Sequence, residues 1–269
     1  MPVAHLKDRA VIAVAGPEAR PFLQGLITND IERLEPGKGI YAALLTPQGK
    51  ILFDFFLVEG DAAILIDCRA EMRDALLKRL NLYKLRSKIV IEPRDQLAVL
   101  AQWDGAVARN AISYADPRLP ELGQRAIIAK GEMRKDLLDE ESYHEHRLAI
   151  GVPEGRDFGS DKMFALDADL DELHGVDFDK GCYVGQELTA RMKHRGTARK
   201  RVLPVEFAQG GAHATAIVSD GRDVGEIVSS YGRRGFAQVR LDRLNEAGKA
   251  VPRSGDAELK LIKPSWLFP

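Results

Sequence analysis

The first half of the chain combines short apolar runs with two segments of helical periodicity. Apolar residues spaced three and four apart predict one helix from Phe22 to Leu34, ended by Pro36-Gly37, and a second from Met72 to Tyr83. Runs of apolar and β-branched residues bounded by turn residues predict strands at 10–14, 41–45, 51–58, 62–67, 89–91 and 97–100. Because strands and helices do not alternate regularly, we expect an α+β fold.

The second half changes character twice. A charged segment with regularly spaced apolar residues predicts a helix over 137–150, and a loop rich in Gly, Pro and Asp follows over 151–161. Beyond residue 198, short apolar stretches are separated by glycines. They lie at 201–207, 215–219, 224–230, 236–241 and 257–262. Evenly spaced short strands of this kind predict a small closed β-barrel at the C-terminal end.

The stretch richest in reactive side chains lies just before the predicted barrel. Residues 180–187 read Lys-Gly-Cys-Tyr-Val-Gly-Gln-Glu, which predicts a demanding loop leading into a basic segment. A lysine beside a thiol favours the thiolate, so Cys182 is a candidate nucleophile, metal ligand or redox group, and Lys180 is its candidate activator or an anion ligand. The ordinary alternative for Cys182 is a buried structural cysteine in a tight turn.

Composition excludes several classes of protein. The chain has 269 residues, a formal charge of −1 and two cysteines, Cys68 and Cys182, too few for a disulfide framework. No apolar run approaches the roughly 20 residues of a membrane span, so we expect no membrane partner. The first residues show neither a signal-peptide core nor an Arg/Ser-rich leader, and we expect a cytoplasmic location. The neutral overall charge makes nucleic acid an unlikely partner.

The motif at 180–187, followed by Arg191 and Arg195-Gly196, resembles the signature of the YgfZ family. These folate-binding proteins act in iron–sulfur cluster assembly or repair and have mitochondrial relatives in the same role. They are related to the glycine-cleavage T-protein, a tetrahydrofolate-dependent aminomethyltransferase. The resemblance extends to residues 22–31, to the hairpin at 46–54 and to residues 147–153.

The resemblance implies a T-protein-like body of two interleaved α/β subdomains around a central cavity, followed by the barrel. The first subdomain is expected at 1–45 and 131–197, the second at 46–130, and the barrel at 198–269. The cavity is expected to hold tetrahydrofolate or a derivative. The residues implied as folate contacts are Asp54, Tyr183, Gln186, Glu187, Arg191, Arg195 and Arg147.

Three departures from the T-protein pattern bear on activity. The T-protein hairpin ends in two adjacent acids, whereas here the pair is Phe53-Asp54. A glutamate that helps to hold the pterin falls at Ala149, which removes acceptors for pterin N–H groups. Cys182 stands where the T-protein has an acid. Two acids lost and one thiol gained point away from plain aminomethyl transfer, and the fold alone does not imply that activity.

The favoured hypothesis is therefore a folate-dependent accessory factor for iron–sulfur cluster assembly or repair, acting through Cys182 on carrier or client proteins. The competing hypothesis is an aminomethyltransferase-like enzyme in which Asp54 holds the folate amine. A third is a tRNA-modification factor recruited by the basic segment at 191–201. No resident metal site is expected, because the histidines are scattered and clusters need several thiolates. Cys182 remains a candidate transient cluster ligand.

Overall fold

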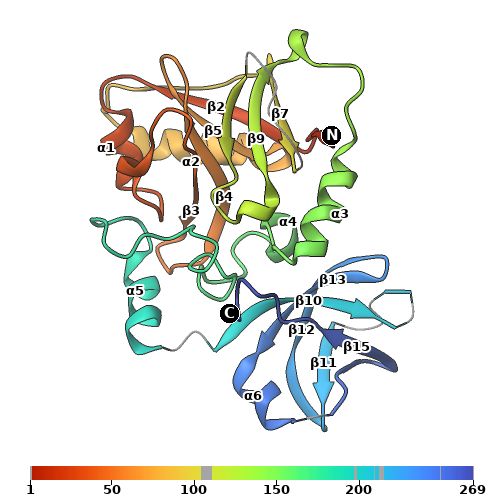
Figure 1. The fold of residues 1–269 in the computed structure, drawn as a ribbon. Coiled ribbons are helices and arrows are strands. Elements are labelled where there is room, and N and C mark those ends of the chain that lie inside the picture. Colours follow the sequence, from red (N-terminus) through yellow and green to blue (C-terminus); the bar gives the residue numbers. More distant parts are fainter. Residues whose placement is uncertain are drawn as a thin grey trace.

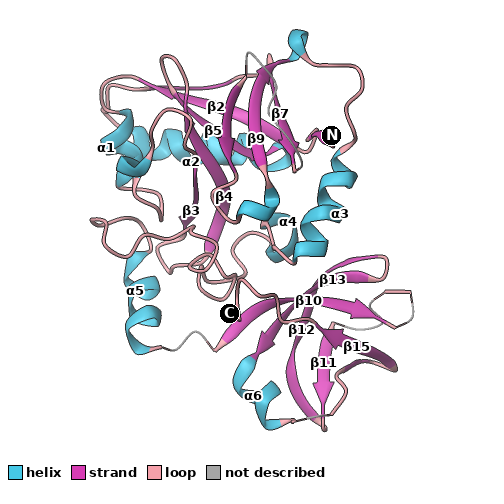
Figure 2. Ribbon diagram, viewed as in Figure 1, coloured by secondary structure: helices cyan, strands magenta, loops and turns pink. Residues whose placement is uncertain are grey.

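Two antiparallel sheets form the body of the protein, and a closed barrel follows them (Figure 1). The computed structural model describes residues 2–103, 111–196, 199–208, 210–211, 215–248 and 250–268. Figure 2 shows that helices accompany the body, whereas the barrel consists mainly of strands. This arrangement confirms the α+β class and the predicted C-terminal barrel.

The larger sheet of the body has five strands in the order β3-β4-β5-β2-β6. Its strands are β2 (Arg9–Ala15), β3 (Ile40–Leu45), β4 (Ile51–Glu59), β5 (Ile64–Arg69) and β6 (Val90–Pro93). Helices α1 (Ala19–Gln24) and α2 (Arg73–Lys84) pack on one face, where Ile12, Leu23 and Leu76 share a core. Alternate residues of the same strands face the other way, as the two-residue period of a strand requires.

The second sheet of the body has four strands in the order β1-β7-β9-β8. These strands are β1 (Val3–His5), β7 (Leu97–Gln102), β8 (Ile112–Ala115) and β9 (Gln124–Ala129). Three of them, β1, β8 and β9, have no counterpart among the predicted strands. The sheet packs on the larger one through a shared core that includes Val11, Phe56, Val99 and Ile127.

Buried charges fill part of the layer between the two sheets. Asp67 accepts from Arg9 at 2.7 Å and from Arg125 at 2.6 Å, and all three side chains are at most 2% exposed. Arg118 pairs with Asp116 at 2.8 Å and with Glu154 at 3.0 Å. The core between the sheets is thus held by paired charges as well as by apolar packing.

The remaining segments of the body connect these sheets to the barrel. Helix α3 (Glu140–Ile150) lies where a helix was predicted, and α4 (Gly155–Phe158) is a single turn. Helix α5 (Gln186–Arg195) begins at the end of the motif at 180–187, called here the thiol motif, and was not predicted. Four short 3-10 turns complete the description: η1 (Ile31–Arg33), η2 (Ala70–Met72), η3 (Pro120–Leu122) and η4 (Lys130–Glu132).

The barrel closes in the strand order β10-β13-β12-β11-β14-β15. Its elements are β10 (Lys200–Phe207), β11 (Ala216–Ser219), β12 (Arg222–Tyr231), β13 (Arg234–Arg240), α6 (Leu241–Glu246), β14 (Arg253–Ser254) and β15 (Ala257–Leu261). Five of the six strands fall on predicted stretches. The two-residue β14 and the helix α6 were not predicted.

Polar contacts fix the barrel to the body. Arg201 of β10 pairs with Asp171 at 2.9 Å. Ser229 and Tyr231 of β12 both donate to Asp157 of α4, at 2.8 and 3.0 Å. Helix α4 therefore contacts both the barrel, through Ser229 and Tyr231, and the body, through Arg147.

The predicted helix from Phe22 to Leu34 is wrong beyond Gln24. Helix α1 ends there, and after an irregular segment only the 3-10 turn η1 follows. Thr28 and Asn29 compete with the helix, because the Thr28 hydroxyl donates to the Gly175 carbonyl at 2.6 Å and the Asn29 amide to the Tyr41 carbonyl at 2.8 Å. Tertiary contacts thus override the helical period.

The larger sheet extends across the predicted domain bound at 45/46. Strands β3 and β4 pair with each other across this bound, so the hairpin belongs to one sheet. The division of the body into domains otherwise stays a prediction. Among the described residues no helix is both long and apolar enough to cross a membrane.

Candidate functional site

The thiol motif forms an irregular loop between the body and helix α5. Gly181 and Cys182 are exposed at its tip, whereas Lys180 and Tyr183 on either side are 7% and 8% exposed. The alternative of a buried structural cysteine is therefore wrong for Cys182. The neighbours of the thiol are anchored in the body, and the thiol itself is presented to solvent.

Lys180 is the main anchor of this loop. Its ammonium donates to three backbone carbonyls, those of Gln24 at 2.9 Å and of Ile27 and Asn29 at 2.7 Å each. Burial lowers the pKa of Lys180 to about 8, and the nearby carboxylates of Asp30 and Asp177 oppose this shift. Lys180 therefore binds the irregular segment after α1, a structural role that the sequence did not predict.

The carbonyls that face Lys180 are available because the chain leaves the helix after Gln24. Side chains replace the lost helical hydrogen bonds. The side-chain oxygen of Gln24 accepts from the Ile31 N–H at 2.9 Å, and the side-chain NH₂ group of Gln24 donates to the Asp30 carboxylate at 2.8 Å. Asn29 also donates to the His174 carbonyl at 2.8 Å. The segment before β3 and the segment before the motif are thus fastened to each other.

Asp177 shapes the start of the loop. Its carboxylate accepts from the backbone N–H groups of Asp179 at 2.8 Å and Lys180 at 3.1 Å, and it pairs with Arg33 at 2.5 Å. An aspartate that bonds to N–H groups two and three residues ahead makes a local turn. The ion pair ties that turn to η1.

The two glycines of the motif differ in their packing. Gly185 has φ +81°, and a Cβ there would lie 2.4 Å from the Thr46 carbonyl oxygen and 2.8 Å from the Leu45 Cβ. Glycine is required at this position because the loop presses against the predicted hairpin turn. A Cβ at Gly181 would meet nothing within 4 Å. Gly181 is therefore not required by packing and leaves the space beside Cys182 open.

Tyr183 is the buried residue that follows Cys182, and it packs against the core of the body. Burial raises the pKa of its phenol to about 12, and the Lys180 ammonium lies 5.1 Å from the centre of its ring. The Val184 N–H donates to the Gly25 carbonyl at 3.3 Å. Tyr183 thus packs into the body and is not a free contact for a ligand.

The other predicted contacts on the motif belong to helix α5. Gln186 is its first residue, and its N–H donates to the Tyr183 carbonyl at 3.3 Å. Glu187 and Arg191 form an exposed ion pair one helical turn apart, at 2.5 Å. Arg195 is exposed at the last turn of the helix. The basic residues therefore line an exposed helix, where the sequence suggested a linker.

Asp54 and Arg147 both contact residues of α4. Asp54 is 5% exposed and accepts from the Tyr41 hydroxyl at 3.0 Å and the Gly155 N–H at 3.2 Å. Arg147 is fully buried and pairs with Asp157 at 2.7 Å. Asp54 and Arg147 thus meet at α4, whereas the other predicted folate contacts belong to the thiol loop and to α5.

Glu154, at the start of α4, was missed by the sequence reasoning. It pairs with Arg118, and although burial alone would raise its pKa, Arg147 and Arg118 hold that pKa well below its usual range. The sequence contained one sign of this buried network of charges, because Asp67 and Arg125 interrupt apolar strands at positions that face the core.

Cys68 is packed in the core, as the sequence predicted. It is 1% exposed on β5, its thiol lies 3.6 Å from the Ala10 carbonyl oxygen, and burial raises its pKa to about 12. Among the described residues no group of three or more His, Cys, Asp or Glu side chains could hold a metal ion. Cys182 is therefore the accessible thiol of the pair.

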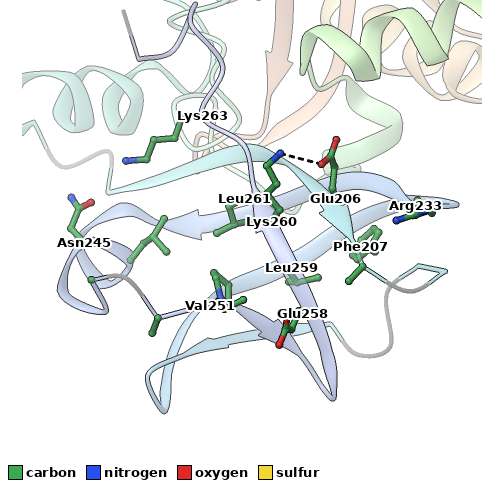
Figure 3. Close-up of a pocket in the computed structure, with 15 residues that line it drawn as sticks. Glu206, Phe207, Arg233, Asn245, Val251, Glu258, Leu259, Lys260, Leu261 and Lys263 are labelled. Carbon is green, nitrogen blue, oxygen red and sulfur yellow. Dashed lines mark ion pairs between the residues drawn. The ribbon is translucent and has the colours of Figure 1, made fainter.

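A large pocket lies on the barrel, away from the thiol loop (Figure 3). Its volume is about 730 Å³, and apolar side chains such as Phe207, Leu259 and Leu261 line it beside charged Arg233 and Lys263. The Glu206–Lys260 ion pair, 3.5 Å long, stands at its edge. Neither Cys182 nor any predicted folate contact lines this pocket. Its size alone assigns it no chemistry.

Comparison of the sequence with known proteins identifies the family of this chain. The chain is 34% identical to the mitochondrial iron–sulfur cluster assembly factor IBA57 of Homo sapiens, over 89% of this chain and 78% of that protein. The corresponding protein of Mus musculus is 33% identical, over 97% and 84%. The chain belongs to the IBA57 family.

Other comparisons agree with this IBA57 membership. A homologue from Neurospora crassa is 36% identical over 81% of this chain, which spans only 56% of that longer protein. Residues 199–269 match the family model of the CAF17 C-terminal beta-barrel domain. The comparisons thus confirm the predicted resemblance to mitochondrial iron–sulfur cluster assembly factors. The resemblance to YgfZ proteins themselves stays a prediction.

A solved structure confirms the predicted fold of this IBA57-family chain. The glycine cleavage system aminomethyltransferase T from Bartonella henselae superposes with a TM-score of 0.78, over 98% of this chain and 85% of that one. The two sequences are 16% identical, so the likeness concerns the fold and not the activity.

The predicted cytoplasmic location is wrong by the same comparisons. The IBA57 relatives from Neurospora crassa, Homo sapiens and Mus musculus are all named as mitochondrial proteins. The prediction rested on the composition of the first residues, which does not report the compartment of a protein on its own.

Proposed function

We propose that this protein serves the assembly or repair of iron–sulfur clusters and that Cys182 contacts the cluster or its carrier. The observation that carries the proposal is the exposed thiol on a loop whose neighbours are fixed by Lys180, Asp177 and Gly185. The names of its IBA57 relatives support the same role.

The chemistry assigned to Cys182 is that of a transient ligand. Its thiol loses a proton and the thiolate binds an iron atom of the cluster, which is the cargo and not a resident group. A cluster needs several thiolates, and the other cysteine of this chain is buried in the core. The remaining ligands must therefore come from a partner, an iron–sulfur carrier or client protein.

The loop is suited to such a shared site because its backbone is pre-positioned. Three hydrogen bonds to Lys180 and the tight packing of Gly185 fix both sides of the thiol before a partner arrives. Binding to a fixed group costs less ordering entropy than binding to a mobile one. The bare Gly181 beside it leaves room for the partner backbone.

The decisive test is rescue of a strain that lacks this protein, with cluster-enzyme activity as the readout. Cys182→Ser should fold with the wild-type unfolding temperature and fail to rescue, because a hydroxyl is a poor iron ligand. Cys68→Ala removes the buried thiol and serves as the matched control that should still rescue. Equal rescue by Cys182→Ser and wild type would refute the role of the thiol.

Folate binding is a separate proposal, and the residues expected to hold the pterin do not fit it in this structure. Asp54 and Arg147 are engaged with α4, and the pocket beside Asp54 has a volume of about 10 Å³, whereas ligand pockets of this class measure roughly 300 Å³ or more. We therefore derive no step through folate. Titration with tetrahydrofolate, followed by the fluorescence of Trp103 and Trp266, tests the proposal directly.

The two alternative functions remain predictions without a supporting observation in the described residues. An aminomethyltransferase would use Asp54 for the folate amine, but that carboxylate already accepts from Tyr41 and Gly155. A tRNA-modification role would rest on the basic residues of α5, one of which, Arg191, pairs with Glu187. Loss of rescue in Asp54→Asn with retained rescue in Cys182→Ser would favour the enzyme.

A further inference from the structure

A second exposed feature lies on the larger sheet, at the end of α2. Residues 75–91 contain five basic residues and no acidic one, although the whole chain has a formal charge of −1. The five are Lys78, Arg79, Lys84, Arg86 and Lys88. In the part of the chain that the structure describes, none of them takes part in an ion pair. We call residues 78–90 the basic turn.

Aliphatic side chains project from the basic turn. Leu85 is 87% exposed, Leu82 61% and Val90 53%. The opposite side of the same segment is firmly packed, because Leu76, Leu80 and Ile89 are buried in the core under the larger sheet. Exposed leucines at the end of a well-anchored helix are not left over from poor packing, and a group of large apolar residues on a surface marks an interaction site.

The backbone holds Leu85 in an unfavourable conformation. This residue ends α2 with φ +45° and ψ −109°, in the region that favours glycine. The turn after it is fixed, because the Ser87 N–H donates to the Lys84 carbonyl and the Lys88 N–H to the Glu18 carboxylate, at 2.8 and 2.9 Å. A glycine would fit here with less strain, so the fold does not explain the leucine.

The surroundings leave the basic turn uncovered. Strand β6 is the last strand of its sheet, and no described strand pairs with its outer edge. Val90 opens this strand, which contacts α2. Cations and exposed aliphatic side chains thus occur together in the segment from the end of α2 to the start of β6.

We propose that the basic turn is a peripheral binding surface for anionic lipid bilayers. Lysine and arginine attract the phosphates of anionic lipids, while aliphatic tips enter the boundary between headgroups and acyl chains. A bilayer accepts projecting side chains, whereas a rigid protein partner would need a pocket for each. Such binding needs no spanning helix, and it revises the expectation of no membrane partner. It is independent of the proposed role of Cys182.

Sedimentation of the full chain with lipid vesicles tests the proposal. The protein should bind vesicles of mixed phosphatidylglycerol and phosphatidylcholine at low salt, bind pure phosphatidylcholine weakly, and dissociate as salt rises. Replacing Lys84, Arg86 and Lys88 by Gln should weaken binding by about a hundredfold. Replacing Lys7, Lys130 and Lys135, three exposed lysines without an ion pair among the described residues, by Gln is the control and should change it little.

Leu85→Gly separates binding from folding. Glycine accepts the backbone conformation, so the unfolding temperature should be unchanged or higher, while binding to anionic vesicles should fall about tenfold. The proposal fails if both triple variants lose binding equally, or if Leu85→Gly binds like wild type. It also fails if the protein binds soluble poly-glutamate and no vesicles, which would identify an acidic protein as the partner.

Discussion

The buried ammonium of Lys180 offers the sharpest test of how the thiol loop is built. Lys180→Met keeps a long unbranched side chain and removes the charge together with three hydrogen bonds. The carbonyls of Gln24, Ile27 and Asn29 then lose their shared donor. Because these carbonyls belong to a segment that is not helical, the loss should loosen the loop and the segment together.

The expected magnitude follows from two opposing contributions. Hydrogen bonds that involve a charged group contribute about 2 kcal/mol each, hence about 6 kcal/mol for three. Burial lowers the pKa of Lys180 from 10.5 to about 8, which corresponds to a cost of about 3 kcal/mol, reduced to about 2 kcal/mol by solvent screening. Lys180→Met should therefore lower the free energy of unfolding by about 4 kcal/mol.

Urea unfolding followed by circular dichroism measures this difference, with Lys135→Met as the matched control at an exposed lysine. Lys180→Arg should restore only part of the stability, because a planar guanidinium cannot direct donors to three carbonyls around one atom. A loss below about 1 kcal/mol for Lys180→Met, equal to that of Lys135→Met, would show that the three contacts do not hold the loop.

Three further predictions concern the same region and its neighbours. Gly185→Ala should cost about 3 kcal/mol in thermal unfolding, because a Cβ meets the hairpin turn at a positive φ, whereas Gly181→Ala should cost almost nothing. Iodoacetamide should alkylate Cys182 in the native protein and spare Cys68, as peptide mass mapping would show, since burial raises the pKa of Cys68 to about 12; modification of both at equal rates would contradict this. Burial raises the pKa of Asp167 to about 6, so the stability that its protonated form contributes is present below pH 3.8 and is lost as pH rises through 6. Asp167→Asn should therefore gain about 1 kcal/mol over wild type at pH 7 relative to pH 5 in urea unfolding, and parallel pH profiles would refute it.

Much of the fold could be predicted because it follows local patterns. The apolar runs of β2, β4 and β5 and the hairpin between β3 and β4 are visible in the sequence, since two-residue alternation and turn residues coincide there. The strands of the barrel were found for the same reason. Strands β1, β8 and β9 of the body were missed. Strand β9 carries Arg125, a charged residue at a position that faces the core, which interrupts the apolar pattern.

The helix prediction failed at the segment on which the thiol loop depends. Residues Leu23, Ile27 and Ile31 have helical spacing, yet the chain leaves the helix, and the carbonyls that this exit frees bind Lys180, about 150 residues later. No local pattern reports such a partner. Conversely, α5 was missed because its residues are mostly polar, and its glycine neighbours suggested a loop.

The position of the site could be predicted in part. Cys182 was singled out because a thiol among two glycines, a lysine and an aromatic is unusual as core sequence, and the structure shows that this thiol is exposed. Its role stays a prediction. The role of Lys180 was predicted differently, since a lysine two residues from a thiol suggests activation and only the structure shows the three carbonyls. The grouping of Asp54 and Arg147 with the motif came from resemblance alone.

Asp54 and Arg147 differ from Cys182 in exposure and in what they contact, and this difference bears on the function of a fold that the chain shares with an aminomethyltransferase. Asp54 and Arg147 keep charged side chains at positions implied for folate, but here both hold α4, which the barrel also grips through Asp157. The interior charges thus stabilise the contact between body and barrel. Cys182, by contrast, is exposed, and a macromolecule can reach it. The proposed role of this thiol therefore needs no buried ligand, and the fold shared with an aminomethyltransferase does not by itself require one.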